Sequence, residues 1–456
     1  MNNLLNKFKK PGPKRILALD GGGIRGVLTI GMLERLETVL RKQHNNPDLL
    51  LCDYFDLIGG TSTGSILATG LALGMTATEL RDHYFNLGGV IFGKKKNIFN
   101  YIANGEKFDY RPLTTSLKNV FGDVRLGDQE KLKTGLCIVT KRLDTSSTWP
   151  FINHPESNYY NDNADLPLWQ LVRASAAAPT YFLPVDLNIG NNEFGTFIDG
   201  GVSMSNNPSF LLLMVATLRG YPFHWKAGAD NLLMVSLGTG FQDPKANADD
   251  LKQKSLVGWA SAIPNYLLLD ANYYNQLIMQ ILSNSPTAKE IDSEVGNLQY
   301  DTVHGKHMLS YLRYDLVFEN DYLHSLGFHF SKEIVDALKS MDSPKYIKEL
   351  YEIGLRAGFG QINPIHFPSN FKLNNNSHSE NQKLRFDAGK KPKVNFENYT
   401  KNPIPVGAVQ IDEAFEVETM EGIMQGKPGD YLMKGPKNEL YVCDEKIFLE
   451  TYTKMK

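Results

Sequence analysis

The chain has only 3 cysteines among its 456 residues, and Cys52, Cys137 and Cys443 lie far apart in the sequence. Three scattered cysteines favour neither a disulfide framework nor a cysteine-based zinc site. The N-terminus is basic but lacks the apolar segment of a secretory signal. We therefore expect a reducing, cytoplasmic location.

Long apolar runs and an excess of charge are also missing. No stretch of about 18 uninterrupted apolar residues occurs, so no membrane-spanning helix is expected. The most apolar stretch, residues 256–270, is broken by Pro264, Asn265 and Asp270. Lys and Arg total 48 against 50 Asp and Glu, a balance that gives no electrostatic footprint for a nucleic acid polymer. Any membrane contact is expected to be peripheral.

Most of the chain alternates between strand and helix patterns. Buried strands are favoured at residues 15–20, 54–58, 134–140, 196–199 and 232–237, and helices at residues 26–41 and 65–73. This alternation predicts an α/β fold with a mainly parallel central sheet.

The composition changes after residue 360. Asn374–Gln382 is polar and low in complexity, which predicts a linker over residues 361–400. Alternating apolar residues and turn signals then predict a small β-rich C-terminal domain over residues 401–456. The remaining residues divide into an N-terminal tail (1–13) and a main domain (14–360).

A glycine loop, Asp20-Gly-Gly-Gly-Ile-Arg-Gly26, joins the first predicted strand to the first predicted helix. Consecutive glycines allow a sharp turn and can point bare N–H groups at a negative oxygen. A dinucleotide site is a rival interpretation, but the spacing does not fit G-x-G-x-x-G with an acid about 20 residues on. Taken alone, the loop fits a tight turn equally well.

A possible nucleophile, Ser62, lies in Gly60-Thr-Ser-Thr-Gly64, and Asp199 ends another apolar strand. Gly60 and Gly64 would let the backbone turn closely enough to expose Ser62 above the sheet. Asp199 precedes two glycines; by itself it reads most simply as a turn cap, but sites in open α/β sheets form at such strand ends. We therefore expect all three segments to converge on one sheet edge.

In form and order, these segments resemble the D-G-G-G-x-R-G, G-x-S-x-G and D-G-[GA] motifs of the patatin-like phospholipase family. The resemblance covers about residues 14–360, and residues 173–181 and 232–240 within this range also resemble the family. It implies a three-layer α/β/α patatin-like fold and a lipid acyl hydrolase of the phospholipase A or lysophospholipase type. The implied substrate is a membrane phospholipid or lysophospholipid.

The resemblance also assigns roles to individual residues. It implies that Ser62 attacks the ester and that Asp199 is the base, which explains why no histidine motif accompanies the serine. It places the oxyanion hole at the loop residues Gly21, Gly22 and Gly23, with Arg25 either fixing this loop or aiding the oxyanion. No metal and no cofactor are implied.

Two other functions stay open. The chain could be a non-catalytic binding protein that retains the fold, or an effector phospholipase of a bacterial defence system activated by a nucleotide signal or partner. Residues 426–432 resemble a short P-G-D-Y type domain, so a regulatory ligand or protein partner is expected at the C-terminal domain.

Three weaker signals carry no assignment. Seven histidines of the main domain, His83, His154, His224, His304, His307, His324 and His329, lie in no recognisable motif. Residues 90–102 interleave lysines with aromatic residues and could touch anionic lipid, although a solvated loop fits better. Residues 256–282 read as core, with an apolar lid as the alternative.

Overall fold

The computed structural model describes residues 3–92, 107–190, 193–242, 255–291, 294–373, 405–419, 422–435 and 439–454. The chain divides into two compact units, Met1–Leu373 and Asn374–Lys456. We call them unit 1 and unit 2.

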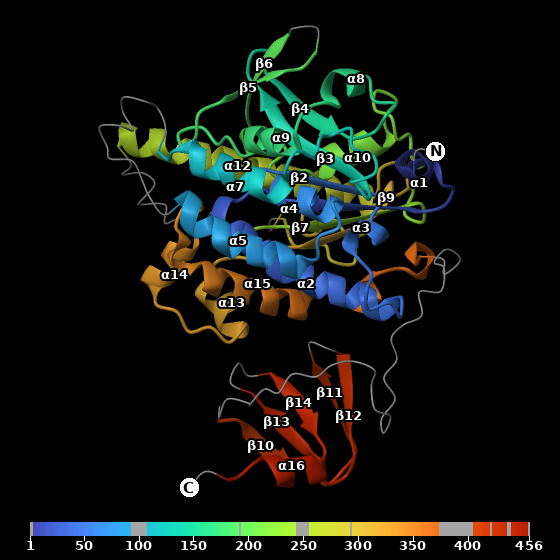
Figure 1. Cartoon of the computed structure of the whole chain (residues 1–456), viewed down its shortest axis with the longest axis vertical. Coiled ribbons are helices and arrows are strands. Elements are labelled where there is room, and N and C mark those ends of the chain that lie inside the picture. The colour runs from blue at the N-terminus through green and yellow to red at the C-terminus, as the bar shows by residue number, and fades with distance from the viewer. Residues whose placement is uncertain are drawn as a thin grey trace. The chain divides into compact units, whose positions relative to one another are not determined.

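Unit 1 is built on a nine-stranded sheet (Figure 1). Its order is β5 (Val185–Asn188), β6 (Phe194–Asp199), β3 (Gly135–Arg142), β2 (Leu57–Thr61), β1 (Lys14–Leu19), β7 (Leu232–Leu237), β9 (Leu309–Tyr314) and β8 (Ser283–Asn284), while β4 (Ser147–Ile152) pairs with β3. The central neighbours β3, β2, β1, β7 and β9 are all parallel, whereas β4 and β6 run antiparallel to β3. The prediction of a mainly parallel sheet is confirmed.

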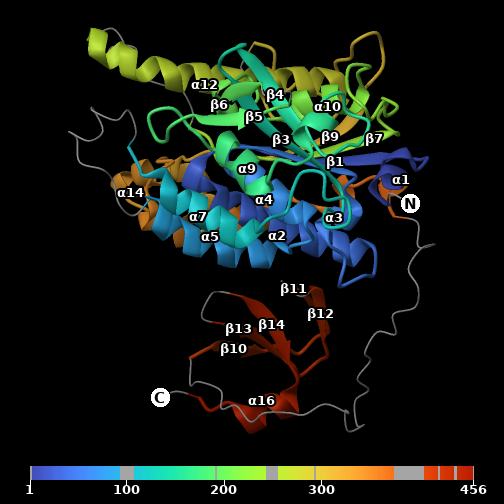
Figure 2. The same ribbon diagram turned by 45° about the horizontal axis from the view of Figure 1, so that its top comes forward.

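Helices cover both faces of the sheet and complete a three-layer α/β/α arrangement (Figure 2). One face carries α10 (Ser209–Thr217) and α12 (Leu256–Leu282); the other carries α2 (Gly26–Gln43), α4 (Thr63–Ala72), α5 (Ala77–Phe92), α7 (Tyr110–Phe121), α9 (Leu168–Ser175) and α15 (Ile347–Gln361). The shorter helices of unit 1 are α1 (Asn3–Lys9), α3 (Leu51–Tyr54), α8 (Tyr160–Asn163), α13 (Asn320–Ser325) and α14 (Lys332–Leu338).

The apolar composition of the central strands follows from this layering. Every residue of β2 and β7 is buried, as is every residue of α4. A strand covered on both faces has no solvent side, so its apolar residues run continuously instead of alternating.

Three segments of unit 1 differ from the sequence-based expectation. The strand expected at residues 54–58 is displaced, because Leu51–Tyr54 forms α3 and β2 begins at Leu57. The Leu50 N–H donates to the Asp53 carboxylate at 3.1 Å, which closes the first turn of α3.

The expected tail and the start of the expected linker are both part of unit 1. In α1, Leu4 and Phe8 are buried, and Phe367 and Phe371 are buried beyond residue 360. Residues 374–400 of the expected linker lie outside the described residues.

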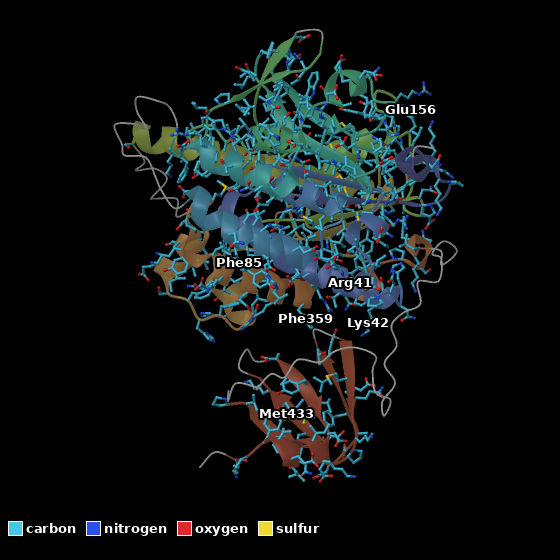
Figure 3. The ribbon with its side chains drawn as sticks, viewed as in Figure 1. Arg41, Lys42, Phe85, Glu156, Phe359 and Met433 are labelled. Atoms are coloured by element: carbon cyan, nitrogen blue, oxygen red, sulfur yellow. The ribbon has the colours of Figure 1, made fainter. Side chains whose placement is uncertain are left out.

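Unit 2 contains two small antiparallel sheets, which confirms a β-rich C-terminal region. One sheet has the order β10 (Gly407–Gln410), β13 (Tyr431–Lys434), β14 (Leu440–Cys443), and the other pairs β11 (Phe415–Thr419) with β12 (Gly422–Gly426). Met433 on β13 is fully buried inside this unit (Figure 3). The terminal helix α16 (Glu445–Thr451) stacks Phe448 on Tyr431, with ring centroids 3.7 Å apart.

Among the helices of the described residues, none is both long and apolar enough to cross a membrane.

Candidate active site

Ser62 occupies a strained turn between β2 and α4. Its backbone has φ 53° and ψ −123°, a region that costs a non-glycine residue roughly 1–3 kcal/mol. The Ser62 N–H donates to the Ser175 hydroxyl at 3.0 Å, and that hydroxyl donates to the Val139 carbonyl at 2.6 Å. These bonds hold the turn in its strained form.

The two glycines of the serine motif are required by close backbone contacts. A Cβ on Gly60 would lie 2.1 Å from the Gly64 carbonyl oxygen, and a Cβ on Gly64 would lie 2.2 Å from the Leu19 carbonyl oxygen. A side chain at Gly64 would push the elbow away from β1, and a side chain at Gly60 would push the start of α4 away from the end of β2. Gly60 and Gly64 therefore permit the turn that exposes Ser62.

Asp199 reaches Ser62 because two strands meet end to end along one edge of β3. Thr61, the last residue of β2, pairs with Val139 in parallel. Asp199, the last residue of the antiparallel strand β6, pairs with the next residue, Thr140. The C-terminal ends of β2 and β6 therefore approach each other from opposite directions.

The Asp199 carboxyl is buried and hydrogen-bonded. The Gly201 N–H donates to it at 2.7 Å, and the Ser62 side chain forms a second hydrogen bond with it. Burial raises the pKa of Asp199 to about 6, and both hydrogen bonds oppose this rise. At neutral pH the carboxylate is ionised and its basicity exceeds that of an ordinary aspartate, so it can accept a proton from Ser62.

The glycine loop offers two N–H groups beside this pair. Gly22 and Gly23 line the same cavity as Ser62, and among the described residues their N–H groups have no hydrogen-bond acceptor. The Gly21 N–H instead donates to the Asn206 carbonyl at 3.0 Å, so it is not available to an oxyanion. Gly23 also requires a glycine, because its φ is +60° and a Cβ there would lie 2.3 Å from the Met341 carbonyl oxygen.

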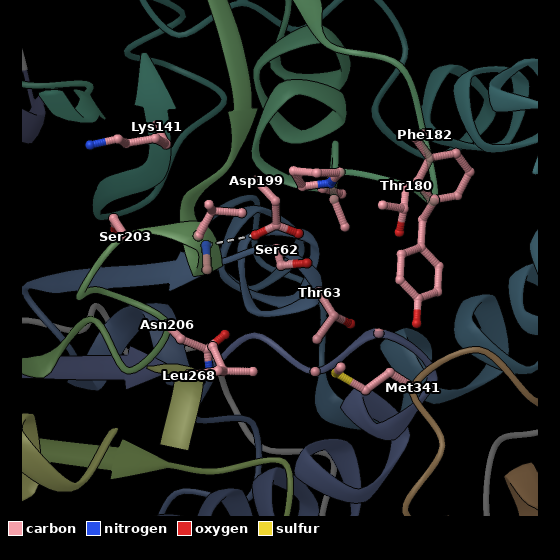
Figure 4. Close-up of a pocket in the computed structure, with 18 of the residues that line it drawn as sticks. Ser62, Thr63, Lys141, Thr180, Phe182, Asp199, Ser203, Asn206, Leu268 and Met341 are labelled. Atoms are coloured by element: carbon pink, nitrogen blue, oxygen red, sulfur yellow. Dashed lines mark hydrogen bonds between the residues drawn. The ribbon is translucent and has the colours of Figure 1, made fainter. Parts of the chain in front are cut away.

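Ser62 and Asp199 open onto a cavity of about 860 Å³, where the Asp199 carboxyl points toward Ser62 (Figure 4). Most of the cavity wall is apolar, including Ile66, Leu113, Phe182, Leu268 and Met341. This volume lies within the range of about 300–1,000 Å³ typical of small-molecule sites. The arrangement can hold an apolar chain with a carbonyl group at Ser62.

Two comparisons with known proteins decide the family. A family profile described as patatin-like phospholipase matches residues 17–213, which contain the glycine loop, Ser62 and Asp199. A protein from Escherichia coli named cGAMP-activated phospholipase is 30% identical over 248 residues, which cover 54% of this chain and 67% of that protein. The chain belongs to the patatin-like phospholipase family.

Two further relatives of this patatin-like chain are matched over less of their length. A cGAMP-activated phospholipase from Vibrio cholerae serotype O1 is 36% identical over 208 residues, covering 43% of this chain and 56% of that protein. Patatin-17 from Solanum cardiophyllum is 32% identical over 242 residues, covering 49% of this chain and 60% of that protein. The chain thus spans little more than half the length of either relative.

Arg25 of the patatin-like loop does not line the cavity. One guanidinium nitrogen donates to the Lys339 carbonyl at 3.5 Å, and the group lies 5.8 Å from the Phe318 ring centroid. Burial lowers the pKa of Arg25 to about 10, partly offset by Asp315, so Arg25 stays cationic at neutral pH. Of the two roles expected for Arg25, this position favours fixing the loop.

Asp20, at the start of the same patatin-like loop, belongs to a buried ion-pair network. Both carboxylate oxygens accept from Arg313, at 2.8 and 2.6 Å. Arg313 also donates to Asp315 at 2.7 Å and to the Ser236 hydroxyl at 2.8 Å. This network anchors the first residue of the loop to β7 and β9.

Tyr84 on α5 links the two halves of the patatin-like site. Its hydroxyl donates to the Gly23 carbonyl at 2.5 Å and lies 2.6 Å from the Thr63 hydroxyl. Burial raises the pKa of Tyr84 above its usual range, so the hydroxyl remains protonated. One hydroxyl therefore connects the glycine loop to the residue that follows Ser62.

The sequence reasoning missed the roles of Tyr84, Ser175 and Arg313. Ser175 lies in the family-like segment 173–181, which is the available signal for it, whereas Tyr84 and Arg313 stand in no motif.

None of the seven histidines named from the sequence lines the cavity: they are His83, His154, His224, His304, His307, His324 and His329. Within the described residues, no group of three or more His, Cys, Asp or Glu could hold a metal ion.

Proposed function

We propose that the chain hydrolyses carboxylic esters of membrane phospholipids or lysophospholipids through an acyl-enzyme on Ser62. The observation that carries this proposal is the hydrogen-bonded pair of Ser62 and buried Asp199 at an apolar cavity of about 860 Å³. The unpaired N–H groups of Gly22 and Gly23 beside the pair, within the described part of the chain, support the same chemistry.

The proposed reaction begins when Asp199 accepts the Ser62 proton as Oγ attacks the ester carbonyl. The N–H groups of Gly22 and Gly23 donate to the oxyanion of the tetrahedral intermediate, each worth about 3–4 kcal/mol by analogy with other hydrolases. Collapse breaks the ester bond, and Asp199 returns the proton to the leaving alcohol. Asp199 then deprotonates a water molecule, whose oxygen attacks the acyl carbonyl; the bond to Ser62 Oγ breaks, Asp199 returns the proton to Oγ, and the fatty acid leaves.

The test is fatty-acid release by the full chain from phosphatidylcholine and lysophosphatidylcholine. Ser62→Ala and Asp199→Asn should each abolish turnover while leaving the protein folded. Ser203→Ala is the matched control, because Ser203 lines the same cavity but its hydroxyl donates to the Gly200 carbonyl; it should retain most activity. Near-normal turnover by Ser62→Ala would refute the proposal.

A second proposal is that a nucleotide signal switches on this hydrolysis, making the chain a regulated effector that acts in the cytoplasm at a membrane surface. It is supported by the names of the Vibrio cholerae and Escherichia coli relatives, both called cGAMP-activated phospholipases. Unit 2 would then be one place for a regulatory ligand or protein partner.

Turnover with and without cyclic GMP–AMP tests the proposed activation: a faster rate with the nucleotide supports it, and an unchanged rate with no thermal shift contradicts it. Nucleotide binding without hydrolysis under any condition would instead indicate a non-catalytic binding protein.

A further inference from the structure

The long helix α12 exposes an apolar stripe to solvent. The helix has 27 residues, and Asp270 is the only Asp, Glu, Lys or Arg among them. Among its described side chains, the exposed large apolar ones are Trp259, Ile263, Leu267 and Tyr274, with exposed fractions of 39%, 48%, 64% and 56%. Spacings of four, four and seven residues place all four on one side of a helix with 3.6 residues per turn. We call these four residues the α12 stripe.

The C-terminal half of α12 packs on unit 1. Ala271, Asn275 and Met279 are buried at a spacing of four residues. In Figure 2, α12 lies along the outside of unit 1 and its N-terminal turns extend past the sheet. Trp259, Ile263 and Leu267 of the α12 stripe lie in the N-terminal half of the helix, before these buried positions.

The stripe is continuous with the mouth of the cavity. Val202, Met204 and Leu267 all line the cavity and are 55%, 56% and 64% exposed, and we call them the apolar rim. The Asn275 side chain donates to the Met204 carbonyl, which fixes the rim against α12. Leu267 belongs to both sets, so an apolar surface runs from the helix into the cavity.

Single exposed apolar residues are common on proteins, but an aligned set that leads into an apolar cavity calls for a ligand. We propose that the α12 stripe and the apolar rim seat the chain on a phospholipid bilayer, so that an acyl chain passes from the bilayer into the cavity. This inference rests on the proposed lipid substrate. Aromatic residues such as Trp259 and Tyr274 suit the boundary between headgroups and acyl chains.

The α12 stripe lies within residues 256–282, for which the sequence leaves an apolar lid open beside a core segment. Of the lysine and aromatic segment 90–102, residues 93–102 lie outside the described part of the chain. On α12 the one formal charge is the exposed carboxylate of Asp270. Because that carboxylate repels anionic headgroups, the proposal favours zwitterionic phosphatidylcholine over phosphatidylglycerol as the seating surface.

The test measures binding of the full chain to phosphatidylcholine vesicles by co-sedimentation, in the Ser62→Ala background so that the lipid is not consumed. Ile263→Ser should lower the vesicle partition coefficient about 10-fold, because one large apolar side chain is no longer buried in the lipid. Ile365→Ser is the matched control, because Ile365 is 83% exposed but lies outside the stripe. Its partition coefficient should be unchanged.

With Ser62 intact, Ile263→Ser should hydrolyse vesicle lipid more slowly but cleave soluble p-nitrophenyl butyrate at the wild-type rate. Asp270→Asn should increase binding to vesicles that contain phosphatidylglycerol. Equal vesicle binding by Ile263→Ser and the control would overturn the inference, as would a dimer that Ile263→Ser converts to monomers. Failure of the wild type to cleave either ester, both without and with cyclic GMP–AMP, would instead refute the proposed function, whatever the vesicle binding.

Discussion

Asp199 pairs with Thr140 on β3 one residue beyond the point where β2 ends, and this register brings its carboxyl to Ser62. The two residues are 137 positions apart in the sequence, since 199 − 62 = 137. Ser62 directly follows the last residue of β2, and Asp199 is the last residue of β6. Both strands pair with the same edge of β3. The distance between base and nucleophile is thus set by sheet register.

The pH dependence of ester hydrolysis should report the ionisation of Asp199. A general base must be deprotonated, and burial raises the pKa of Asp199 to about 6. We expect kcat/KM to be constant above about pH 7 and to fall about tenfold per pH unit below pH 6. A pH–rate profile of wild type with soluble ester checks this; a profile that stays flat down to pH 4.5 would exclude Asp199 as the titrating base.

Asp199→Asn should stabilise the folded protein at high pH. The folded-state pKa of about 6 lies above the ordinary value of 3.8, so burying the ionised carboxylate disfavours the folded state once the pH exceeds both values. At pH 8 the variant should gain on the order of 3 kcal/mol in free energy of unfolding, and the gain should shrink as the pH falls from 6 to 4. Urea denaturation at pH 8 and pH 4 measures both; a variant less stable than wild type at pH 8 would contradict the expectation.

Tyr84→Phe should impair catalysis more than binding. The change removes only the hydroxyl that holds the Gly23 carbonyl and contacts Thr63. We expect kcat to fall about 10-fold with KM nearly unchanged, because the oxyanion donors lose alignment while the cavity keeps its shape. Tyr351→Phe is the control: its hydroxyl donates to Glu34, away from the cavity. A Tyr84→Phe enzyme with wild-type kcat would show that this bridge does not position the loop.

Arg313→Met should destabilise unit 1 strongly. It leaves Asp20 and Asp315 buried without their cation, and removing one partner of a buried ion pair costs about 3–5 kcal/mol. Arg125→Met removes a surface pair with Asp165, whose side chains are 54% and 89% exposed, and should cost less than about 1 kcal/mol. Urea unfolding of both variants makes the comparison; equal losses would contradict a structural role for the buried network.

Local chemistry predicts more of the site than long-range pairing does. Gly60, Ser62 and Gly64 can be identified because a strand-to-helix turn requires small residues at those positions. Gly21 is expected beside Gly22 and Gly23 as an oxyanion donor, but its N–H donates to the carbonyl of Asn206. That partner lies 185 positions away, since 206 − 21 = 185, and no local pattern encodes it.

The same limit applies to the fold. Apolar runs predict most central strands, because continuous burial leaves a clear signal. Strand direction leaves no such signal in the sequence. The strand that ends at Asp199 is expected among the parallel strands, whose carboxyl ends form the site edge, but β6 runs antiparallel to β3. The apolar residues Leu51 and Tyr54 belong to a short helix, so the strand expected at 54–58 is shifted. In unit 2, the sequence segments that form β12, β13 and α16 are too short for their patterns to predict these elements.

The most direct test of the Ser62–Asp199 pair is the rate of covalent labelling by a fluorophosphonate, followed by peptide mass spectrometry. We expect a single adduct on Ser62, a labelling rate constant that falls as the pH drops below about 6, and labelling at least about 100-fold slower in Asp199→Asn. An adduct on another residue, or equal labelling rates in wild type and Asp199→Asn, would contradict the assignment of Ser62 as nucleophile and Asp199 as its base.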